Sequence, residues 1–349
     1  MRLGVRLRRS FLCHGQRRQS LPSLGLSERA ISSQATDAAS RMMDRFANSI
    51  TIRRQIIDAN QLQKLLLTLG RTQVNEVDIS IEPPRKGTPV PAGYHLVYFT
   101  PAAIEGNLGA DGSDRTYNPP DHFTRRMWAG GHMCWPSANI STPVQLRVGD
   151  QAEEHTRFVS AVPKKSSSGG EMVLVELEKE IRTPRGCAVL DRRSWIFRPE
   201  VDLETNFEYG TASEIYNRPS TMRDFSSDND AGTIRQVCWS PVGLFRFSAL
   251  TFNGHMIHYN QEWCKSVEGH PNTVVHGPLN LICILDYWRD VYGKGTGPSS
   301  IKYRALSPLY AGETYMIRTQ QFGQNTGGLT RGIIAERDGK TCMRAEITS

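Results

Sequence analysis

The stretch "HGPLNLICILDYW", residues 276–288, constrains the fold of this chain more than any other segment. From Pro278 to Trp288, eight of the eleven positions carry apolar or aromatic side chains. A helix that is apolar all round must be buried on every side. Pro278 suits the first helical position, where its missing N–H costs nothing. We therefore expect a single buried helix enclosed by other secondary structure.

Strands are the expected enclosure, and they occur in two similar sets. The first set contains "VQLRVGDQAEEHTRFVSAV", "GGEMVLVELEKEI" and "GCAVLDRRSWIFR", separated by turns. The second set contains "LYAGETYMIRTQQF" and "GGLTRGIIAERDGKTCMRAEI". Each set has a Gly-acid pair opening a strand, then Gly-Gly, a strand, a Gly-containing turn and another strand. This order indicates an internal duplication; two unrelated antiparallel meanders are the alternative.

An antiparallel sheet around one buried helix is a hotdog, and the 349 residues are enough for two compact domains. We therefore predict an α+β fold, a double hotdog with two antiparallel sheets each wrapped around a central helix. The expected boundaries are an N-terminal hotdog-like domain over 45–199, a polar linker over 200–233 and a C-terminal hotdog domain over 234–349. We further expect a helix within 56–70 that ends at Gly70, a strand over "YHLVYFT" (94–100) and a loop over 106–121.

The positive charge of the chain is concentrated at its beginning. The formal net charge is +7, and the first 29 residues hold seven arginines and a single acid, Glu28. The remainder is nearly neutral, so a phosphate-binding surface for nucleic acid is not indicated. An opening rich in Arg, Ser and Leu is typical of a mitochondrial transit peptide, which we expect over 1–40. A disordered basic tail is the alternative.

Cysteine spacing and hydropathy exclude other classes. The seven cysteines are scattered without a CxxC pair, so they favour small core residues over a zinc ribbon or a disulfide framework. No run approaches the roughly 18–20 apolar residues of a membrane span. His255 and His258 would need a third ligand to bind zinc, and no cysteine or carboxylate has suitable local spacing. We therefore expect no metal or other cofactor, and neither a nucleic acid nor a membrane as partner.

The segment "FSALTFNGHMIHYNQEWCKSVEGHPNTVVHGPL", residues 247–279, resembles the hydratase segment of the MaoC-like (R)-specific enoyl-thioester hydratases and dehydratases. The resemblance is greater to the two-domain branch with the fungal mitochondrial type 2 hydroxyacyl-thioester dehydratases. "RRMWAGG", "VQLRVGD" and "SPLYAGE" are also similar to that branch. The family pattern is G-D-x-N-P-x-H. Here Asn253 stands at the Asp position, His255 at the Asn position and His258 at the final His.

The resemblance implies interconversion of (3R)-3-hydroxyacyl and trans-2-enoyl thioesters. His258 would then be the acid and base, because an imidazole titrates near neutrality. Asn253, which cannot act as a base, and His255 would position the water or hydroxyl. Gly277 lies where a helix begins with free N–H groups, which suits it to stabilise the thioester oxygen. In structural terms, His258 could instead cap a helix and His255 could simply pack in the core.

Four further residues are candidates for substrate binding: His276, Arg126, Trp128 and Lys302. Ordinary packing, helix capping or solvation is the structural alternative for each. The N-terminal half lacks a histidine pair, so we expect it to shape the acyl pocket without chemistry of its own. The expected partner is acyl carrier protein or CoA as the carrier of the thioester. The expected location is the mitochondrial matrix, with the chain a monomer of tandem hotdogs or a homodimer.

Three other functions stay open at this point. One is hydration of branched dicarboxylic CoA esters such as mesaconyl-CoA or itaconyl-CoA, which needs a basic residue facing the distal carboxylate. Another is thioester hydrolysis by a hotdog thioesterase, which needs a carboxylate poised at the carbonyl; Asn253 argues against it. The last is a non-catalytic acyl-thioester binding or scaffold protein, which would bind a thioester without turnover.

Overall fold

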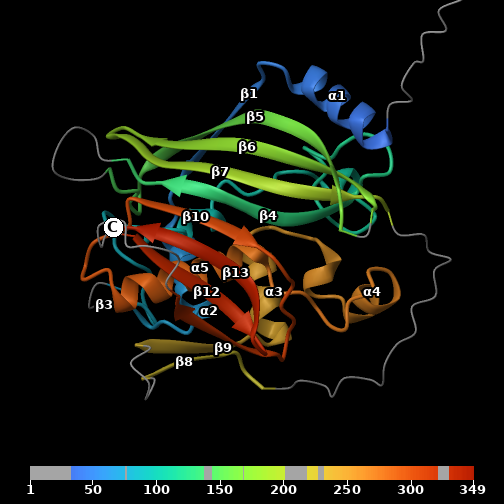
Figure 1. The fold of residues 1–349 in the computed structure, drawn as a ribbon. Coiled ribbons are helices and arrows are strands. Elements are labelled where there is room, and N and C mark those ends of the chain that lie inside the picture. Colours follow the sequence, from blue (N-terminus) through green and yellow to red (C-terminus); the bar gives the residue numbers. More distant parts are fainter. Residues whose placement is uncertain are drawn as a thin grey trace, which may run out of the picture. The chain divides into compact units, whose positions relative to one another are not determined.

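One antiparallel sheet of 11 strands runs through the protein, in the order β1-β5-β6-β7-β4-β10-β13-β12-β11-β9-β8 (Figure 1). The computed structural model describes residues 33–74, 77–136, 144–167, 169–200, 218–226, 232–320 and 330–349. The first half contributes β1 (Ile50–Ile56), β4 (Arg125–Cys134), β5 (Gln151–Lys165), β6 (Glu171–Thr183) and β7 (Gly186–Arg198). The second contributes β8 (Thr221–Ser226), β9 (Thr233–Cys238), β10 (Ser300–Ala305), β11 (Thr314–Thr319), β12 (Thr330–Arg337) and β13 (Lys340–Thr348). A separate hairpin pairs β2 (Gln73–Val74) with β3 (Val77–Asp78).

The sheet order shows that the chain is built from two copies of one unit. Reading outward from the centre gives β4, β7, β6, β5, β1 on one side and β10, β13, β12, β11, β9 on the other. The copies meet where β4 pairs with β10, so the two sheets that we expected are joined edge to edge into one. The α+β double hotdog and the internal duplication are thereby confirmed.

The turns that open corresponding strands are alike in detail. Gly149 and Gly312 both have positive φ, 86° and 81°, immediately before β5 and β11. In each turn the following acid accepts a backbone N–H: Asp150 from Arg147 at 2.8 Å, and Glu313 from Tyr310 at 3.1 Å. A left-handed residue followed by an acidic acceptor explains the repeated Gly-acid pair, because glycine adopts this conformation without strain.

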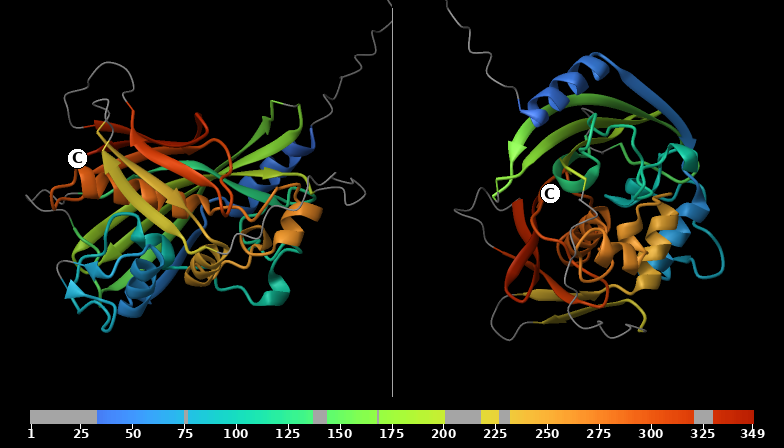
Figure 2. Two further views of the ribbon diagram at one scale, coloured as in Figure 1. Left: turned by 90° about the horizontal axis from the view of Figure 1, so that it is seen from below. Right: turned by 90° about the vertical axis from the view of Figure 1, so that its right-hand side faces the viewer.

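The expected central helix is α5, Gly277–Val291. Every residue from Leu279 to Trp288 is buried, as the sequence predicted. The polar Asp286 is satisfied inside the core, since it accepts from the Tyr94 hydroxyl at 2.9 Å and from Arg71 Nε at 3.1 Å. The shorter helices α2 (Ala59–Thr68) and α3 (Pro241–Leu250) pack against each other, and the edge-on view of Figure 2 shows them beside α5.

The first half has no counterpart of α5 among its described residues. "YHLVYFT" was expected to be a strand, and this was wrong, because Tyr94–Val97 forms the 3-10 helix η1. Its buried side chains, Tyr94 and Val97, share one apolar cluster with α5. The chain lies so close to α5 that a Cβ on Gly93 would come within 2.5 Å of Leu285 Cδ1. Packing against α5 therefore replaces the sheet pairing that an apolar run suggests.

Two expected boundaries also differ from the structure. Helix α1 (Gln34–Phe46) begins inside the expected leader, and its Ala35, Ala38 and Ala39 are buried in a cluster with residues of β5 and β6. The rest of the leader, 1–32, lies outside the described residues. The expected linker over 200–233 contains β8, which pairs with β9; its residues 201–217 and 227–231 are also outside the described part.

Several other expectations agree with the structure, although Cys134 and Cys187, which were expected in the core, are only half-buried. Helix α2 ends at Thr68 and Gly70 has φ 72°, the left-handed conformation expected after a helix. Residues 106–121 form a loop that opens with the 3-10 helix η2 (Glu105–Asn107). Cys238, Cys264, Cys283 and Cys342 are buried as core residues. Within the described residues, no helix has the length and apolar character needed to cross a membrane.

Candidate active site

His255 and His258 lie in residues 251–266, which we call the histidine segment. After α3 this segment forms a turn, the 3-10 helix η3 (Met256–His258) and α4 (Gln261–Ser266). The side-chain oxygen of Asn253 accepts the backbone N–H of His255 at 3.1 Å, which fixes the turn. Asn260 accepts from Trp263 N and begins α4, so His258 is not the cap of that helix. Both His255 and His258 are buried, and their ring centres lie 5.5 Å apart.

One hydrogen bond determines the proton positions on His258. Its Nδ1 lies 2.8 Å from the carbonyl oxygen of Val274. A carbonyl only accepts, so Nδ1 carries the proton and Nε2 of the neutral ring keeps its lone pair. Burial lowers the pKa of His258 to about 3, and the neighbouring His255 adds to this effect. His258 is therefore a neutral imidazole, and its unprotonated nitrogen, Nε2, can act as a base.

The ring of His276 packs against the ring of His258. His276 is the residue before α5, it is buried, and it stacks on His258 with ring centres 3.6 Å apart. Its Nε2 lies 2.9 Å from the Ser248 hydroxyl. Burial, with His258 and His255 close by, holds the pKa of His276 well below its usual value. His276 is thus a neutral ring that orients His258, and its side chain makes no capping hydrogen bond.

The sequence analysis missed one acidic residue of the site. Asp111, from the long loop of the first half, places Oδ2 3.2 Å from Nε2 of His255. Burial would raise the pKa of the Asp111 carboxyl, but His255 and the Ser113 N–H hold it well below its usual range. No spacing signal could have found this pair, because the two residues come from different halves of the chain.

Gly277 opens α5 and lies against the first half of the chain. A Cβ at this position would come within 2.8 Å of Trp128 Cβ and Cγ, so only glycine fits without displacement. The first N–H groups of a helix have no intrahelical acceptor and carry the positive end of the dipole. Gly277, Trp128 and His258 line one cleft. The arrangement offers a backbone donor to an oxygen that gains negative charge.

Arg126, on β4, belongs to the same cleft. Its Nη1 lies 3.8 Å from Asp114 Oδ2, beyond hydrogen-bond distance, and its guanidinium lies 5.1 Å from the centre of the Trp195 ring. Burial lowers the pKa of Arg126, and the carboxylates of Asp114 and Asp111 oppose that shift. Arg126 is therefore a half-buried cation that is incompletely paired by the described residues.

The concave side of the first half is polar where a second central helix would lie. Lys179 Nζ lies 2.8 Å from Glu154 Oε1, and Arg193 is ion-paired with the buried Asp191. The Arg193 guanidinium lies 5.2 Å from the centre of the Trp128 ring. Glu154, Lys179 and Arg193 line the cleft that also contains the histidines. The first half thus contributes charged side chains to the cleft, and not only apolar ones.

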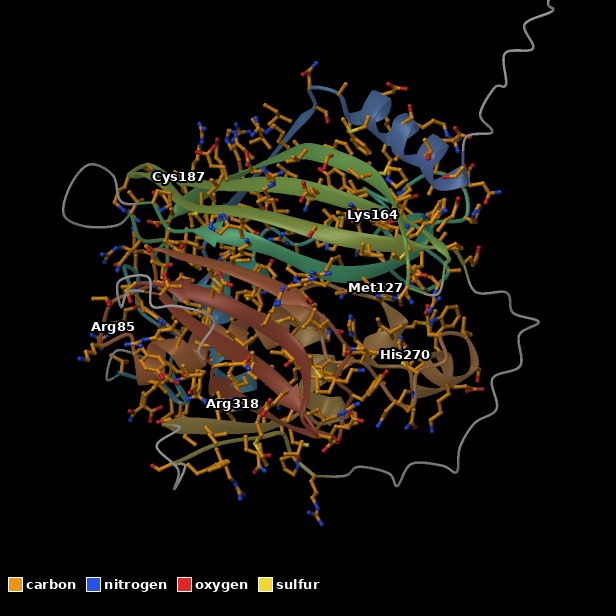
Figure 3. All side chains as sticks on the ribbon, viewed as in Figure 1. Arg85, Met127, Lys164, Cys187, His270 and Arg318 are labelled. Atoms are coloured by element: carbon orange, nitrogen blue, oxygen red, sulfur yellow. The ribbon has the colours of Figure 1, made fainter. Side chains whose placement is uncertain are left out.

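Lys302 borders the large cleft that also contains the histidines. It is exposed on β10 and faces away from Tyr303, because successive side chains of a strand point to opposite faces. Tyr303 is buried and stacks with Trp128, with ring centres 6.2 Å apart. Arg125, the first residue of β4, forms an ion pair with Glu268, with Nη2 2.7 Å from Oε2. Figure 3 labels Met127 on β4 and His270 beside α4, and both residues line the cleft.

Comparison with known proteins points to one family. Residues 93–311 match the family model described as hydroxyacyl-thioester dehydratase type 2. The mitochondrial hydroxyacyl-thioester dehydratase type 2 of Schizosaccharomyces pombe is 29% identical over 269 residues, 68% of this chain and 80% of that protein. The mesaconyl-C(4)-CoA hydratase of Chloroflexus aurantiacus is 27% identical over 301 residues, 80% of this chain and 95% of that protein.

A solved structure shares the fold. The MaoC-like dehydratase of Phytophthora capsici superposes with a TM-score of 0.54 at 14% identity, covering 88% of this chain and 98% of that one.

Proposed function

The chain belongs to the hydroxyacyl-thioester dehydratase type 2 family, and on this premise we propose that it is a hydro-lyase that interconverts (3R)-3-hydroxyacyl and trans-2-enoyl thioesters. The observation that carries the proposal is the state of His258. A buried imidazole with Nδ1 bonded to Val274 and Nε2 free is a base ready at neutral pH. It shares a cleft with Gly277, a donor for the thioester oxygen.

The chemistry needs a base, an acid and an oxyanion donor. His258 Nε2 removes the proton from the α-carbon, and the bond electrons form the double bond as the 3-hydroxyl departs with a proton. The thioester oxygen gains negative charge on the way, and the Gly277 N–H stabilises it. Loss of such a donor costs about 3–4 kcal/mol in comparable sites. The reaction changes no overall oxidation state, so side chains suffice and no cofactor is required.

The mitochondrial matrix is the proposed location, and mitochondrial fatty acid synthesis the proposed setting. The support is the Schizosaccharomyces pombe relative, whose name describes it as mitochondrial, together with the arginine-rich, acid-poor residues 1–29. Acyl carrier protein would then carry the substrate, with CoA esters as surrogates. Imaging of the full chain fused to a fluorescent protein, with and without residues 1–32, tests the location.

Product analysis tests the reaction itself. The full chain is incubated with a trans-2-enoyl-CoA, and acyl-CoA products are first separated from free CoA. The acyl-CoA fraction is then hydrolysed, and chiral chromatography identifies the 3-hydroxy acid. A (3R)-3-hydroxy product that still carries CoA supports the proposal. Release of free CoA would indicate a thioesterase, and binding without turnover would indicate a scaffold protein.

Arg126 favours one alternative, hydration of enoyl-CoA esters that carry a distal carboxylate. A half-buried guanidinium without a hydrogen bond to the described residues would gain a bidentate partner in such a carboxylate. The Chloroflexus aurantiacus relative is named for a substrate of this class. The test compares kcat/KM for an enoyl-CoA with and without the terminal carboxylate. If the alternative holds, Arg126→Leu lowers only the value for the dicarboxylic ester, by 100-fold or more.

A further inference from the structure

The two buried histidines of the cleft have different electrostatic surroundings. His258 donates to a neutral carbonyl, whereas His255 faces the carboxylate of Asp111 at 3.2 Å. A desolvated ring bonded only to a carbonyl stays neutral, whereas His255 has a charged partner. The rings of His258, His276 and His270 also interact electrostatically with His255. Asp111 is thus the acidic group nearest to His255.

The carboxylate is held in place by its own loop. Its Oδ1 accepts the Ser113 N–H at 2.9 Å, which leaves Oδ2 to His255. The backbone oxygen of Asp111 accepts the N–H of Met256 at 2.8 Å, so the loop is bonded to η3 itself. These bonds fix both ends of the contact between the loop and the histidine segment.

The loop approaches so closely that two glycines are needed. Gly112 has φ 77°, and a Cβ there would come within 2.1 Å of the Gly254 oxygen. A Cβ on Gly254 would in turn come within 2.9 Å of the Gly112 oxygen. The loop of the first half therefore places a carboxylate beside the histidines of the second half. Asn253 occupies the position at which the family pattern has an aspartate, so the histidine segment does not supply this acid itself.

We propose that Asp111 is a positioning residue whose charged carboxylate supports and orients His255 toward the departing 3-hydroxyl, so that His255 is the acid and His258 the base of the dehydration. This assignment rests on the proposed hydro-lyase function. It means that the first half completes the catalytic centre, besides shaping the pocket.

The proton balance of the step is complete. His258 Nε2 takes the α-proton, and that C–H electron pair becomes the carbon–carbon π bond. The C3–O bond breaks toward oxygen, and His255 gives the proton on Nδ1, the nitrogen that does not face Asp111, to form water. The site then holds a protonated His258 and a neutral His255, and proton exchange with water restores the starting state. Hydration runs through the same steps in reverse.

Substrates that differ only in the leaving group test the assignment. The full chain and its Asp111→Asn variant are compared on a 3-hydroxyacyl-CoA and on the matching 3-chloroacyl-CoA, whose chloride leaves without a proton. The asparagine keeps the shape and an acceptor oxygen but removes the charge. We expect dehydration to fall at least 100-fold while chloride elimination stays within about threefold. Asp121→Asn, on the same loop but paired with Arg41, is the matched control and should change neither rate.

Each outcome has a distinct meaning. If Asp111→Asn slows both eliminations equally, the residue is merely structural and the proposal is wrong. Unchanged dehydration would overturn it as well. His258→Asn should abolish both eliminations, because the α-proton must leave in each. If the unsubstituted protein dehydrates no hydroxyacyl thioester, the proposed function fails first and the assignment falls with it.

Discussion

The imidazole rings of His258 and His276 are stacked, with their centres 3.6 Å apart and their planes 17° from parallel. Both rings are buried, and two like charges at this distance would repel each other strongly. The pair therefore stays neutral in the folded protein, and burial lowers the pKa of both rings. The stack explains how a base is kept available in the interior.

Acid should destabilise the protein through these rings. Because the pKa of His258 is lowered from 6.5 to about 3 by folding, the unfolded chain binds more protons between these values. The free energy of unfolding then falls as the pH falls through 6.5. From pH 7 to pH 5, His258 accounts for a loss of about 2 kcal/mol. Urea unfolding of the original chain and of His258→Asn at both pH values measures this; equal losses would contradict the prediction.

Gly277→Ala should impair activity by displacing Trp128. The added Cβ would meet Trp128 Cβ and Cγ at 2.8 Å, which are not atoms at a flexible end. Overpacking of this kind costs about 1–3 kcal/mol, and we expect kcat to drop at least tenfold as the backbone donor moves. Gly106→Ala is the control, since no atom lies within 4 Å of its Cβ. An unchanged kcat for Gly277→Ala would exclude Gly277 as the oxyanion donor.

Asp286→Asn should weaken the fold without disabling the site. Asp286 is fully buried and is ion-paired with Arg71 and Arg289. Breaking a buried pair from one side costs about 3–5 kcal/mol. Nine residues of α5 separate it from Gly277, about 13 Å at the helical rise, so kcat should stay within about twofold where the variant is folded. Urea denaturation measures the change in the free energy of unfolding, and kcat is measured below the melting temperature of the variant. A large loss of kcat in folded protein would contradict the prediction that stability and activity are separate here.

The sequence allowed the enclosure of α5 to be predicted, because a helix that is apolar all round has no exposed face. The Gly-acid turns before β5 and β11 were likewise visible, since each is set by two adjacent residues. "YHLVYFT" misled for a physical reason: an apolar run does not distinguish pairing in a sheet from packing against a helix. The chain at Gly93 packs against Leu285 of α5, which is distant in the sequence, so the local sequence does not reveal this contact.

The site was predictable only where it is local in sequence. His255 and His258 lie on one short segment, and Gly277 starts the helix that follows. Asp111 reaches His255 because Gly112 and Gly254 let two loops touch, and that contact belongs to the tertiary structure. The polar lining of the first half could not be predicted for the same reason. Lys179 and Arg193 lie in strands without a local signal of a site, and only the tertiary structure places them in the cleft.

The most direct test of the account is the rate at which the full chain hydrates a trans-2-enoyl-CoA, measured beside His258→Asn. The account predicts a (3R)-3-hydroxyacyl-CoA product from the unsubstituted chain and a loss of at least 1,000-fold in the variant, with both proteins folded by circular dichroism. A variant that retains more than about a tenth of the rate would show that His258 is not the base.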